Sequence, residues 1–512
     1  MRVAIVGCGP KGTYALERLV GWSNGSATSG IELTVYEPNP FPGAGPAYDP
    51  RSGEHLLMNY PAAKIDLAHP RPPRGYAGPS FVEWSGRRPD SYAPRAEVGG
   101  YLHEGLLRLL DDAPFAVHLH PAEVRGLRRS SEGWIIAVGP EGDQEKDFDE
   151  VLLAVGHRST PSPPLSGVAA GCKVSLRGFG LTAVDLVLEL TEGRGGRFAG
   201  QPWSGLTYLE SNAEPMRIRP WSRSGRPMLV KPDLPVAQST LMSEKVGAAR
   251  ARLTTLRDPL DLAGLIEIEV ALAVELLVGC GAPAEIDRIG SWFERASRGG
   301  LPSCADPLGL IRHSLEVAVG GSSPGIEWAI GAAWRESYPA IVSRLSHGGL
   351  RAGDRLAFRT LAAELERLAF GPPALNAAKL IALAETGILD LSAPTRAASP
   401  DEICLDARIA PPGLHPDQNP MGSLVSAGAV CVPPGLRGIE IDREARCIGE
   451  DGSPTSGLSA TGRLTEDWVI GNDSLSRSLH PELDRWARRT CLVAPGGGRE
   501  AHPDLSTAGA RR

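Results

Sequence analysis

The chain has 512 residues, of which 42% are hydrophobic and 22% are charged. This length and composition are typical of a globular protein with two or three folded units, each large enough to enclose a nucleotide. The formal net charge of −7 disfavours a nucleic acid or an anionic membrane as partner, so we expect a small-molecule ligand.

The sequence predicts neither a membrane anchor nor a network of disulfides. The apolar run at residues 3–6 is too short for a signal peptide, and the most apolar long segment, residues 265–279, contains three glutamates that a membrane span would not tolerate. The eight cysteines show no paired spacing, which disfavours disulfides, a zinc site and a dithiol relay of the disulfide-reductase kind. We expect a protein of the reducing cytoplasm without a bound metal.

The N-terminal segment reads as a strand, a glycine-rich turn, a helix and a second strand. Residues 2–6 (RVAIV) form a short β-rich run, and the letters GCGPKG mark the turn. Residues 31–37 (IELTVYE) supply the second strand after a polar connection. This order predicts a βαβ unit of ordinary size.

The turn carries a GxGxxG motif, which is typical of dinucleotide-binding sites. Gly7 permits a tight turn, Gly9 lets a pyrophosphate approach the backbone, and Gly12 allows the helix to pack closely on the strand. Pro10 lies in the same loop, and Glu37 ends the second strand, where its carboxylate can accept hydrogen bonds from ribose hydroxyls. A carboxylate there disfavours a 2′-phosphate, so we predict FAD or NAD at this loop; the alternative is an ordinary glycine turn.

The same order of elements returns near residue 172. Residues 173–177 (KVSLR) form a strand, and residues 206–210 (LTYLE) are expected to be the strand that follows. Between them, Gly178, Gly180 and Ala183 make a GxGxxA motif at the start of a helix. Strand, glycine turn and helix also occur without a ligand in α/β proteins, but two such units in series predict two nucleotide-binding domains.

Four arginines beyond the second expected strand indicate which nucleotide the second unit binds. A guanidinium pairs bidentately with a phosphate, whereas a carboxylate repels it, so the cluster favours NADPH over NADH. Glu210 at the end of the expected strand is compatible with NADH, which is therefore an alternative coenzyme. The alternative to a phosphate site is that the arginines form a solvated basic face. The four are Arg217, Arg219, Arg223 and Arg226.

The remainder of the chain changes character twice. Between residues 242 and 388, apolar residues recur at a spacing of three to four, which predicts a helical insertion or cap. From 389 to 436 proline and glycine are frequent, which indicates connections and short strands, and 437–493 is the last stretch expected to be ordered. Residues 494–512 lack an apolar period and are expected to be disordered.

Several segments carry a resemblance to a known family. GCGPKGTYALERL, PFPGAGPAYDP and HLLMNYPAAKIDL resemble FAD/NAD(P)-binding proteins of the flavin-dependent monooxygenase superfamily. Within it, the chain looks most similar to the actinobacterial branch that contains aspartate N-oxidising, nitrosuccinate-forming enzymes. The segments 94–102, 149–157 and 457–477, with GFGLTAVDL and WSRSGRP, extend the likeness over most of the chain. The helical middle matches least well.

The resemblance implies an α/β fold with two Rossmann-like dinucleotide-binding domains. Residues 1–165 would form the first part of the FAD-binding domain, and residues 166–241 the NAD(P)-binding domain. Residues 242–388 would be the helical insertion, and residues 389–493 the connection and the return to the FAD domain. A disordered tail at 494–512 would follow.

For the flavin site, the resemblance implies roles for two segments of the first domain. HLLMNYP would pass near the isoalloxazine ring, where Asn59 would hydrogen-bond the flavin edge or a bound nicotinamide, unless Met58 and Asn59 only begin a loop. PRAEVGGYL brings Arg95 toward the cofactor, although a surface ion pair is equally consistent with the sequence. Lone histidines such as His157 and His480 are more often structural than catalytic.

Two further segments supply the remaining candidates by resemblance. Gly462 would let the backbone approach FAD. A helix expected to begin near Asn472 or Asp473 would point its positive end toward the N1 and C2 carbonyl region of the flavin, with a plain N-cap role as the alternative for Asp473. WSRSGRP resembles the family's SR segment, so Arg223 is the first choice for the 2′-phosphate and Arg226 the second.

The function implied by the resemblance is that of an FAD-dependent, NADPH-oxidising monooxygenase that N-hydroxylates or N-oxidises a small amino acid. NADPH would reduce FAD, oxygen would add to give a flavin C4a-hydroperoxide, and the amine would attack its distal oxygen. The cofactors carry this chemistry, so no catalytic residue is assigned. A flavin oxidoreductase without oxygen insertion and a redox-silent flavin-binding protein are the alternatives. The expected partners are a small-molecule substrate and molecular oxygen. The sequence is also compatible with a homo-oligomer.

Overall fold

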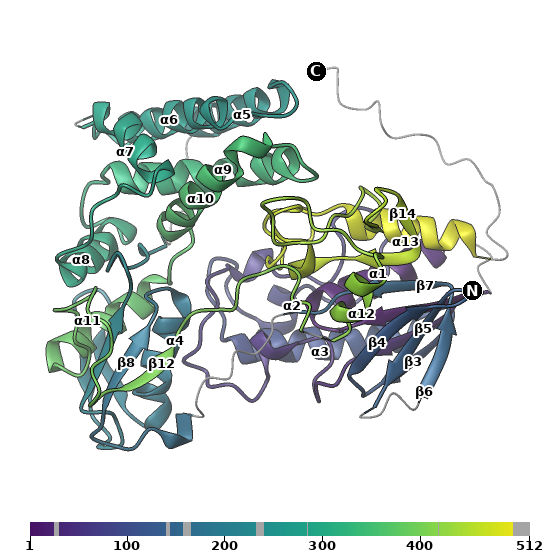
Figure 1. The fold of residues 1–512 in the computed structure, drawn as a ribbon. Coiled ribbons are helices and arrows are strands. Elements are labelled where there is room, and N and C mark those ends of the chain that lie inside the picture. Colours follow the sequence, from purple (N-terminus) through teal and green to yellow (C-terminus); the bar gives the residue numbers. More distant parts are fainter. Residues whose placement is uncertain are drawn as a thin grey trace.

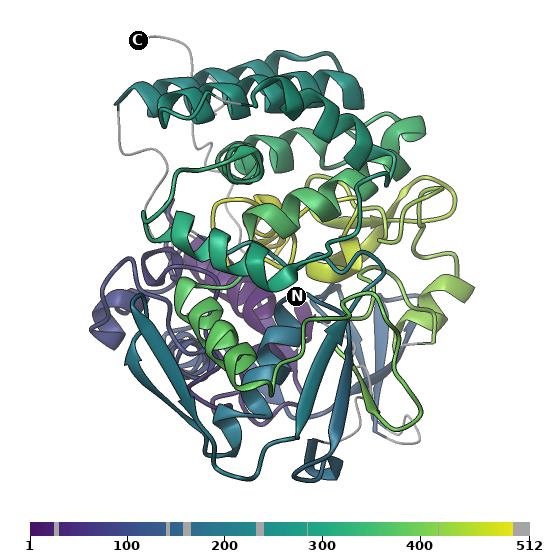
Figure 2. The same ribbon diagram turned by 90° about the vertical axis from the view of Figure 1, so that its left-hand side faces the viewer.

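Segments far apart in the sequence build three regions, a first α/β domain, a second α/β domain and a helical layer (Figure 1). The computed structural model of the protein describes residues 1–24, 30–139, 144–156, 165–231, 240–283, 285–417 and 419–494. In Figure 1 the second domain lies at the lower left, the first domain at the right and the helical layer above. After a quarter turn the helical layer still lies above the sheets (Figure 2).

A six-stranded sheet forms the centre of the first domain. Its order is β13-β14-β7-β1-β2-β3, and neighbouring strands are parallel except for β13, which is antiparallel to β14. Nearly all side chains of β1 and β7 are buried, as expected for parallel strands covered on both faces. The two strands expected in the N-terminal segment are confirmed. The strands are β1 (Arg2–Val6), β2 (Glu32–Tyr36), β3 (Ala116–His120), β7 (Glu150–Leu153), β13 (Arg446–Ile448) and β14 (Pro454–Ala460).

Helices from both ends of the chain pack together on this sheet. α1 (Pro10–Ser23) contacts α3 (Arg95–Asp111) and α13 (Glu482–Val493). Leu16 and Leu19 of α1 are fully buried. Because β14 and α13 come late in the sequence, the chain returns to the domain in which it began.

A buried carboxylate fastens the returning segment to the sheet. Glu150 on β7 accepts hydrogen bonds from Ser459 on β14 (2.6 Å) and from the indole of Trp486 on α13 (2.9 Å). The guanidinium of Arg489 lies 2.9 Å from the same carboxylate. A buried charge is tolerated when it is paired and hydrogen-bonded, so these contacts hold β14 and α13 against the N-terminal strands.

A small antiparallel sheet and short helices complete the first domain. The strand order is β4-β5-β6, and α12 packs against β4. The strands are β4 (Val124–Arg129), β5 (Trp134–Val138) and β6 (Gln144–Phe148). The short helices are η1 (Pro46–Tyr48), η2 (Ala62–Lys64), α2 (Phe81–Ser85), α12 (Met421–Ser426) and η6 (Gly462–Thr465).

The second domain has a three-stranded parallel sheet with the order β11-β8-β12. β12 comes from the proline- and glycine-rich stretch after residue 389, so part of that stretch belongs to the second domain. A separate antiparallel pair, β9 and β10, lies beside it. The elements are η3 (Leu165–Gly167), β8 (Lys173–Arg177), α4 (Leu181–Glu189), η4 (Glu192–Arg194), β9 (Arg197–Gln201), β10 (Gly205–Leu209), β11 (Arg217–Trp221) and β12 (Ile403–Asp406).

The strand expected at residues 206–210 forms, but its expected place beside β8 was wrong. It is β10 of the hairpin, and the parallel neighbour of β8 is β11. The sequence RIRPW of β11 contains two arginines and a proline, which are unusual in a buried strand. Its arginines are tolerated there because carboxylates from later segments pair with them, and no local pattern shows this.

Within the described residues, seven helices occupy the region expected to be helical. α5, α6, α7, α9 and α10 share one apolar core, whereas α8 and α11 pack against the second domain. Among the described helices, none combines the length and the apolar character needed to cross a bilayer. The elements are α5 (Thr240–Thr255), α6 (Leu262–Gly279), α7 (Asp287–Ser297), α8 (Pro307–Ala318), α9 (Ile326–Leu345), η5 (Ala352–Asp354), α10 (Arg355–Ala369) and α11 (Ala374–Thr386).

Candidate active site

The first glycine loop connects β1 to α1 and leaves no room for side chains. Gly7 has a φ of +91°, and a Cβ atom there would lie 2.8 Å from the carbonyl oxygen of Ala154. A Cβ on Gly12 would lie 2.2 Å from the carbonyl oxygen of Gly7. The helix and the loop can therefore pack this closely only with glycine at both positions.

The N-terminal turn of α1 is suited to face an anion. Gly9 is the N-cap and offers no side-chain acceptor, and Pro10 occupies the first helical turn, where its missing N–H matters least. Uncapped amides at a helix N-terminus attract phosphate groups. A second glycine segment borders the loop, since a Cβ on Gly45 would lie 3.3 Å from Cα of Gly9. These backbones form a narrow cradle that small residues keep open.

Glu37 lies directly after β2 and beside the glycine loop. Its Oε2 accepts a hydrogen bond from the N–H of Cys8 (2.6 Å), and its Oε1 accepts one from the N–H of Asn39 (2.9 Å). The fold thus brings this carboxylate and the loop together at the carboxyl ends of β1 and β2, where parallel sheets bind nucleotides.

The returning C-terminal segment borders the same cradle. Gly462 follows β14 with a φ of +75°, and a Cβ there would lie 3.6 Å from Cγ of Lys11 on α1. Burial lowers the pKa of Lys11 to about 8, against the opposing influence of Asp473. Because its ammonium group is already desolvated, Lys11 is well suited to pair with an anion.

The helix expected near Asn472 and Asp473 does not form, so this prediction was wrong. The side-chain amide of Asn472 donates to Oγ1 of Thr465 (2.7 Å), and its backbone N–H donates to the carboxylate of Glu466 (3.0 Å). These bonds close a local turn, and the next helix is α13. Asp473 is therefore no N-cap; its side chain is 62% exposed and lies 3.6 Å from Arg463.

Asn59 lies where the three regions meet. Its side-chain amide donates to the carbonyl of Phe370 at the end of α10 (3.0 Å). Its backbone carbonyl accepts a hydrogen bond from Nζ of Lys231, which follows β11 of the second domain (2.5 Å). The preceding residue, Met58, is buried. The segment HLLMNYP thus joins all three regions.

The other candidates of the first domain have structural partners. Arg95 begins α3 and lies 2.6 Å from Asp185 on α4, so this ion pair joins the two α/β domains. Burial lowers the pKa of His480 to about 4, and its Nε2 donates to the carbonyl of Ile470 (2.8 Å). His480 is therefore neutral at pH 7. His157 lies outside the described residues.

The second glycine loop joins β8 to α4 and is more open than the first. A Cβ on Gly178, whose φ is +133°, would lie 3.0 Å from the carbonyl oxygen of Ala407. Gly180 is the N-cap of α4, and the nearest atom to a Cβ there would be Sδ of Met228 at 4.0 Å. Ala183 fills the third position and is buried. Within the second loop, the backbone conformation therefore requires glycine only at Gly178.

Two of the four arginines expected near a phosphate are structural. Arg219 is fully buried on β11, 2.5 Å from Glu402. Arg217 on the same strand lies 3.6 Å from this carboxylate. Both lie beyond the strand expected at 206–210, as predicted, but within β11, a strand that the sequence did not predict. Glu210, expected to end the parallel strand, instead follows the hairpin strand β10.

The remaining two arginines differ in availability. Arg226 lies 2.5 Å from Glu364 on α10 and donates to the carbonyls of Leu301 and Pro302. Arg223 is exposed and forms no hydrogen bond or ion pair with a described residue. Of the four, Arg223 is therefore the one whose guanidinium is open to a ligand.

Three cations converge beside Asn59 and form a cationic cluster of Lys64, Lys231 and Arg335. Burial, with Arg335 and Lys64 adding to it, lowers the pKa of Lys231 to about 7. Lys231 and Lys64 lie 6.0 and 5.9 Å from the ring centroid of Tyr60. Arg335 on α9 donates to one backbone carbonyl (3.0 Å). None of the three forms an ion pair with a described residue, although the carboxylate of Glu336 acts on Arg335 from a distance.

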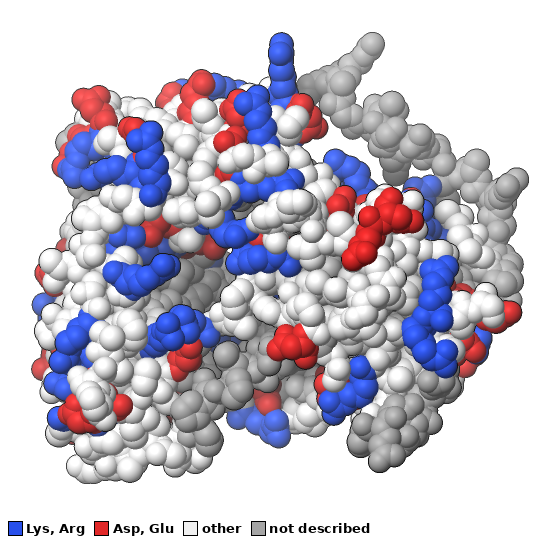
Figure 3. All heavy atoms as spheres, in the orientation of Figure 1, with Lys and Arg blue, Asp and Glu red and all other residues white. Residues whose placement is uncertain are grey.

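The cationic cluster is suited to carboxylates. Lys231 and Arg335 are partly buried, whereas Lys64 is exposed. Partly buried positive charges without partners cost free energy, and charge-assisted hydrogen bonds to an anion remove that cost. The molecular surface is hollowed between the two α/β domains, and Lys and Arg side chains lie along the upper rim of the hollow (Figure 3). A positively charged rim of this kind attracts anionic small molecules.

A cavity of about 320 Å³ lies between α9, α10 and the returning segment. Burial, with Asp473 and Glu466 adding to it, raises the pKa of Glu366 on α10 to about 8. Burial also raises the pKa of Glu466 to about 7. Arg437 lines the cavity as well, but its guanidinium lies 2.6 Å from Asp467. The charged lining is balanced, with the arginines Arg355, Arg359, Arg437 and Arg463 beside the carboxylates Glu366, Glu466, Asp467 and Asp473.

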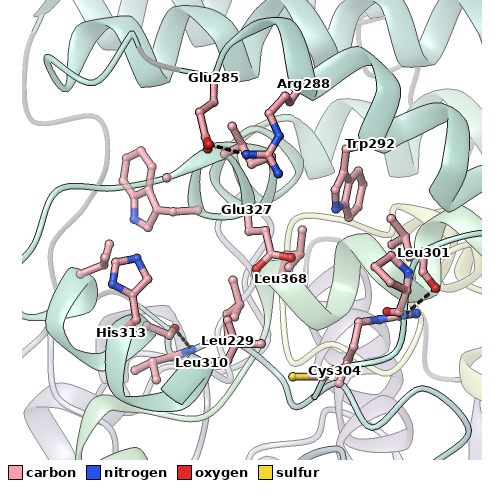
Figure 4. A pocket seen from close by; sticks show the side chains of 18 of the residues that line it. Leu229, Glu285, Arg288, Trp292, Leu301, Cys304, Leu310, His313, Glu327 and Leu368 are labelled. Carbon is pink, nitrogen blue, oxygen red and sulfur yellow. Dashed lines mark hydrogen bonds and ion pairs between the residues drawn. The ribbon is translucent and has the colours of Figure 1, made fainter. Parts of the chain in front are cut away.

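A second cavity, of about 460 Å³, lies between α7, α8 and α9 (Figure 4). Apolar side chains such as Trp292 line most of it, the carboxylate of Glu327 points toward its centre, and the ion pair of Glu285 with Arg288 lies at one side. Arg335 lines this cavity, and its charge also lowers the pKa of Lys231. The arginine thus connects the cavity with the cationic cluster.

Several residues of this region carry no sequence motif and were missed by sequence reasoning. Three of them lay in segments that the sequence analysis quotes: Lys11 in the GxGxxG loop, Lys64 in HLLMNYPAAKIDL and Glu466 in 457–477. The others come from segments that meet only in the folded chain; Lys231 is 172 residues from its partner Asn59. The missed residues are Lys11, Lys64, Lys231, Arg335, Glu366 and Glu466.

Comparisons with known proteins agree with this geometry over the first domain. Residues 4–158 match the model of a family described as FAD-NAD(P)-binding. A nitrosuccinic acid synthase of Aspergillus oryzae is 34% identical over 272 residues, which cover 45% of this chain and 41% of that protein. An L-aspartate N-monooxygenase (nitrosuccinate-forming) of Streptomyces cremeus is 31% identical over 289 residues, with 44% and 42% covered.

The chain spans less than half the length of these curated relatives. Among solved structures, an ornithine hydroxylase of Pseudomonas aeruginosa shares 11% identity and a TM-score of 0.45, covering 96% of this chain and 98% of that one. The sequence matches confirm the expected resemblance to the nitrosuccinate-forming branch and the FAD-NAD(P)-binding nature of the first domain.

Proposed function

We propose that the protein is an FAD-dependent, NADPH-oxidising monooxygenase that N-oxidises a small amino acid with an additional carboxylate, aspartate being the first candidate. The cationic cluster carries this proposal, because a dicarboxylate would supply the ion-pair partners that Lys64, Lys231 and Arg335 lack. The relatives named for aspartate N-oxidation and for nitrosuccinate formation support the same substrate class.

The cradle of the first domain fits FAD. Gly7, Gly9, Pro10 and Gly12 would hold the pyrophosphate against the start of α1, because a Cβ in this loop would fill the space. Glu37 would accept hydrogen bonds from the ribose hydroxyls. The residues proposed to border the flavin are Asn59, Arg95, Gly462 and Asp473.

The second domain fits NADPH. Gly178, Gly180 and Ala183 would approach its pyrophosphate at the start of α4. Arg223 would pair with the 2′-phosphate, since its guanidinium is exposed and unpaired among the described residues. A role for Arg226 would require it to leave Glu364, which makes it the weaker candidate. When bound, FAD and NADPH supply the electrons and the activation of oxygen.

In this proposal the chain itself binds, orients and shields the substrate. Lys231 and Arg335 would fix the carboxylates, and their fixed charges would hold the amine in one orientation. The helical layer would limit water at the reacting atoms. The eight thiols are all free in the structure, which suits the proposed cytoplasmic location.

The proposal is tested by turnover of aspartate under ¹⁸O₂. We expect purified protein to be yellow, to consume NADPH in the presence of aspartate, and to form a nitrogen-oxidised product that contains ¹⁸O. NADPH consumption with unlabelled product would instead indicate an oxidoreductase without oxygen insertion. Colourless protein that binds neither cofactor would overturn the proposal.

The Lys231→Met variant tests the observation on which the proposal depends. Removal of one charge from a shielded ionic contact costs about 2 kcal/mol or more, so we expect the KM for aspartate to rise at least about thirtyfold. The matched control is Lys245→Met, which removes an exposed lysine paired with Glu275 and should leave the KM unchanged. Equal KM values for the two variants would contradict the assignment.

A further inference from the structure

Two ion pairs join the first α/β domain to α4, the helix that follows the second glycine loop. Nε2 of His55 lies 2.6 Å from the carboxylate of Glu189, and the guanidinium of Arg95 lies 2.6 Å from the carboxylate of Asp185. The side chain of His55 is only 9% exposed, and those of Arg95 and Asp185 are 25% and 16% exposed. These contacts are therefore more shielded from water and salt than an ordinary surface ion pair.

The backbone of the first domain sets the two basic residues side by side. Residues 55–58 and 93–95 pair in an antiparallel bridge, in which the N–H of Arg95 donates to the carbonyl of Leu56 (2.8 Å). His55 directly precedes Leu56 in the chain. The basic groups thus reach α4 from two neighbouring, hydrogen-bonded segments.

The acidic partners have a matching arrangement on α4. Asp185 and Glu189 are four residues apart, so they share one face of the helix. Burial raises the pKa of Asp185, and both Arg95 and His55 oppose this rise. Because both basic groups act on one carboxylate, the four side chains form a single network. We call His55, Arg95, Asp185 and Glu189 the interdomain network.

The segment HLLMNYP (55–61), which borders the flavin in our proposal, contacts the second domain at two points. At its start, His55 packs against η4 as well as α4, since a Cβ on Gly193 would lie 3.0 Å from Cε1 of His55. Four residues later, the carbonyl of Asn59 accepts the hydrogen bond from Lys231 (2.5 Å). The second domain is thus held directly against this segment.

The other side of the network lies close to the proposed NADPH loop. Gly180 is the N-cap of α4, and the helix has only nine residues. The position of α4 against the first domain therefore also fixes the position of the loop. Reacting atoms must approach to about 3–3.5 Å, and a displacement of about 1 Å can slow a reaction about a hundredfold.

We infer that the interdomain network holds the second domain at the position from which NADPH reduces FAD. This inference rests on the proposed function and adds positioning residues to it. In the reduction step, one hydride, which is a proton with two electrons, leaves NADPH to give NADP⁺ and reduces FAD. His55, Asp185 and Glu189 would touch neither coenzyme and would act through the position of α4.

The test changes the α4 side of the network, because Arg95 is also proposed to border the flavin. The double variant Asp185→Asn with Glu189→Gln removes both carboxylates while keeping the size of the side chains. In anaerobic stopped-flow measurements, we expect flavin reduction by NADPH to slow at least about tenfold. The Kd for NADPH should change less than about threefold, and reduction by dithionite, which does not need the second domain, should keep its rate.

Hydrogen exchange tests the same inference without turnover. Residues 54–58 and 93–96 belong to the first domain, so their amides should exchange faster in the α4 double variant only if the network holds the two domains together. The conservative variant Asp185→Glu, which keeps the charge, should retain most of the reduction rate.

The matched control is Glu385→Gln, which removes an exposed carboxylate of α11 paired with Arg312 of α8. It should leave both the reduction rate and the exchange unchanged. The inference is overturned if the double variant reduces its flavin at the wild-type rate, if NADPH binding weakens as much as reduction slows, or if exchange at 54–58 does not change. If NADPH does not reduce the flavin of the wild-type protein, the proposed function fails, whereas exchange still decides whether the network holds the domains together.

Discussion

The two glycine loops share a sequence pattern but differ in how tightly the backbone is packed around them. At the third position of the first loop, a Cβ on Gly12 would lie 2.2 Å from a backbone oxygen. The second loop already has a side chain there, that of Ala183. The first loop belongs to a six-stranded sheet and the second to a three-stranded one.

This difference separates two kinds of nucleotide site. A loop that is closed around its glycines and covered by the returning segment suits a cofactor that stays bound. A loop with an open N-cap glycine and an exposed arginine suits a coenzyme that leaves in every cycle. In the function that we propose, the first loop would hold FAD and the second would hold NADPH, and the packing around each loop would decide which.

The largest effect is expected for Gly12→Ala in the first loop. The new methyl group would meet backbone that cannot move without shifting α1, so we expect a loss of about 3 kcal/mol in unfolding free energy or more, and loss of FAD. The flavin absorbance of the purified protein measures its FAD content, and urea unfolding measures the unfolding free energy.

Because Ala183 already holds the third position of the second loop, Gly180→Ala at its N-cap is the comparison there. Its nearest neighbour would be Sδ of Met228 at 4.0 Å, so the protein should keep its flavin and its stability. If the two variants retain equal amounts of FAD, tighter packing of the first loop does not explain how it differs from the second.

The second domain depends instead on a buried ion pair, and Glu402→Gln tests this dependence. The hydrogen-bonded guanidinium of Arg219 lowers the pKa of Glu402 to about 2. A carboxylate with a lowered pKa stabilises the fold above its unfolded pKa, and this contribution is lost as the pH falls toward 2. We expect Glu402→Gln to lower the unfolding free energy by about 3 kcal/mol at neutral pH, with a smaller difference in acid.

Asp401→Asn provides the neighbouring control for this experiment. Asp401 forms an exposed pair with Lys173, so its replacement should change the stability little at any pH. A pH-independent difference between wild type and Glu402→Gln would show that the ion pair is not the source of the stability.

A smaller effect is expected for the choice of coenzyme. Arg223→Ala should raise the KM for NADPH by about tenfold and leave the KM for NADH unchanged, because only NADPH carries the 2′-phosphate. Steady-state kinetics with both coenzymes measure the ratio. Arg226→Ala, which leaves Glu364 without its partner, should reduce stability and affect both coenzymes equally. If Arg226→Ala raised the KM for NADPH alone and Arg223→Ala did not, Arg226 would be the residue that binds the 2′-phosphate.

The sequence predicted the elements whose determinants are local. The strand, glycine turn and helix of both loops follow from short apolar runs and from glycines at fixed spacing, and both are present. Glu37 could be placed because its position after β2 is also a local feature. The family resemblance supplied the expected cofactors and the substrate class that we propose.

Other features depend on contacts between distant residues and were beyond sequence reasoning. β11 was missed because its arginines are neutralised by Glu402, which lies far along the chain. The helix expected at Asn472 was wrong because Glu466 and Thr465 take up its polar groups. Lys231 and Glu366 join the candidate site only when three regions meet.

The parallel pairing of β14 with β7 has a consequence for biosynthesis. While the polypeptide emerges from the ribosome, the first sheet keeps an open edge until residues 454–460 arrive to cover it. The second domain and the helical layer have by then been translated and can fold ahead of it. Flavin capture would thus mark the end of folding, since the pocket closes only when the two most distant parts of the nascent protein come together.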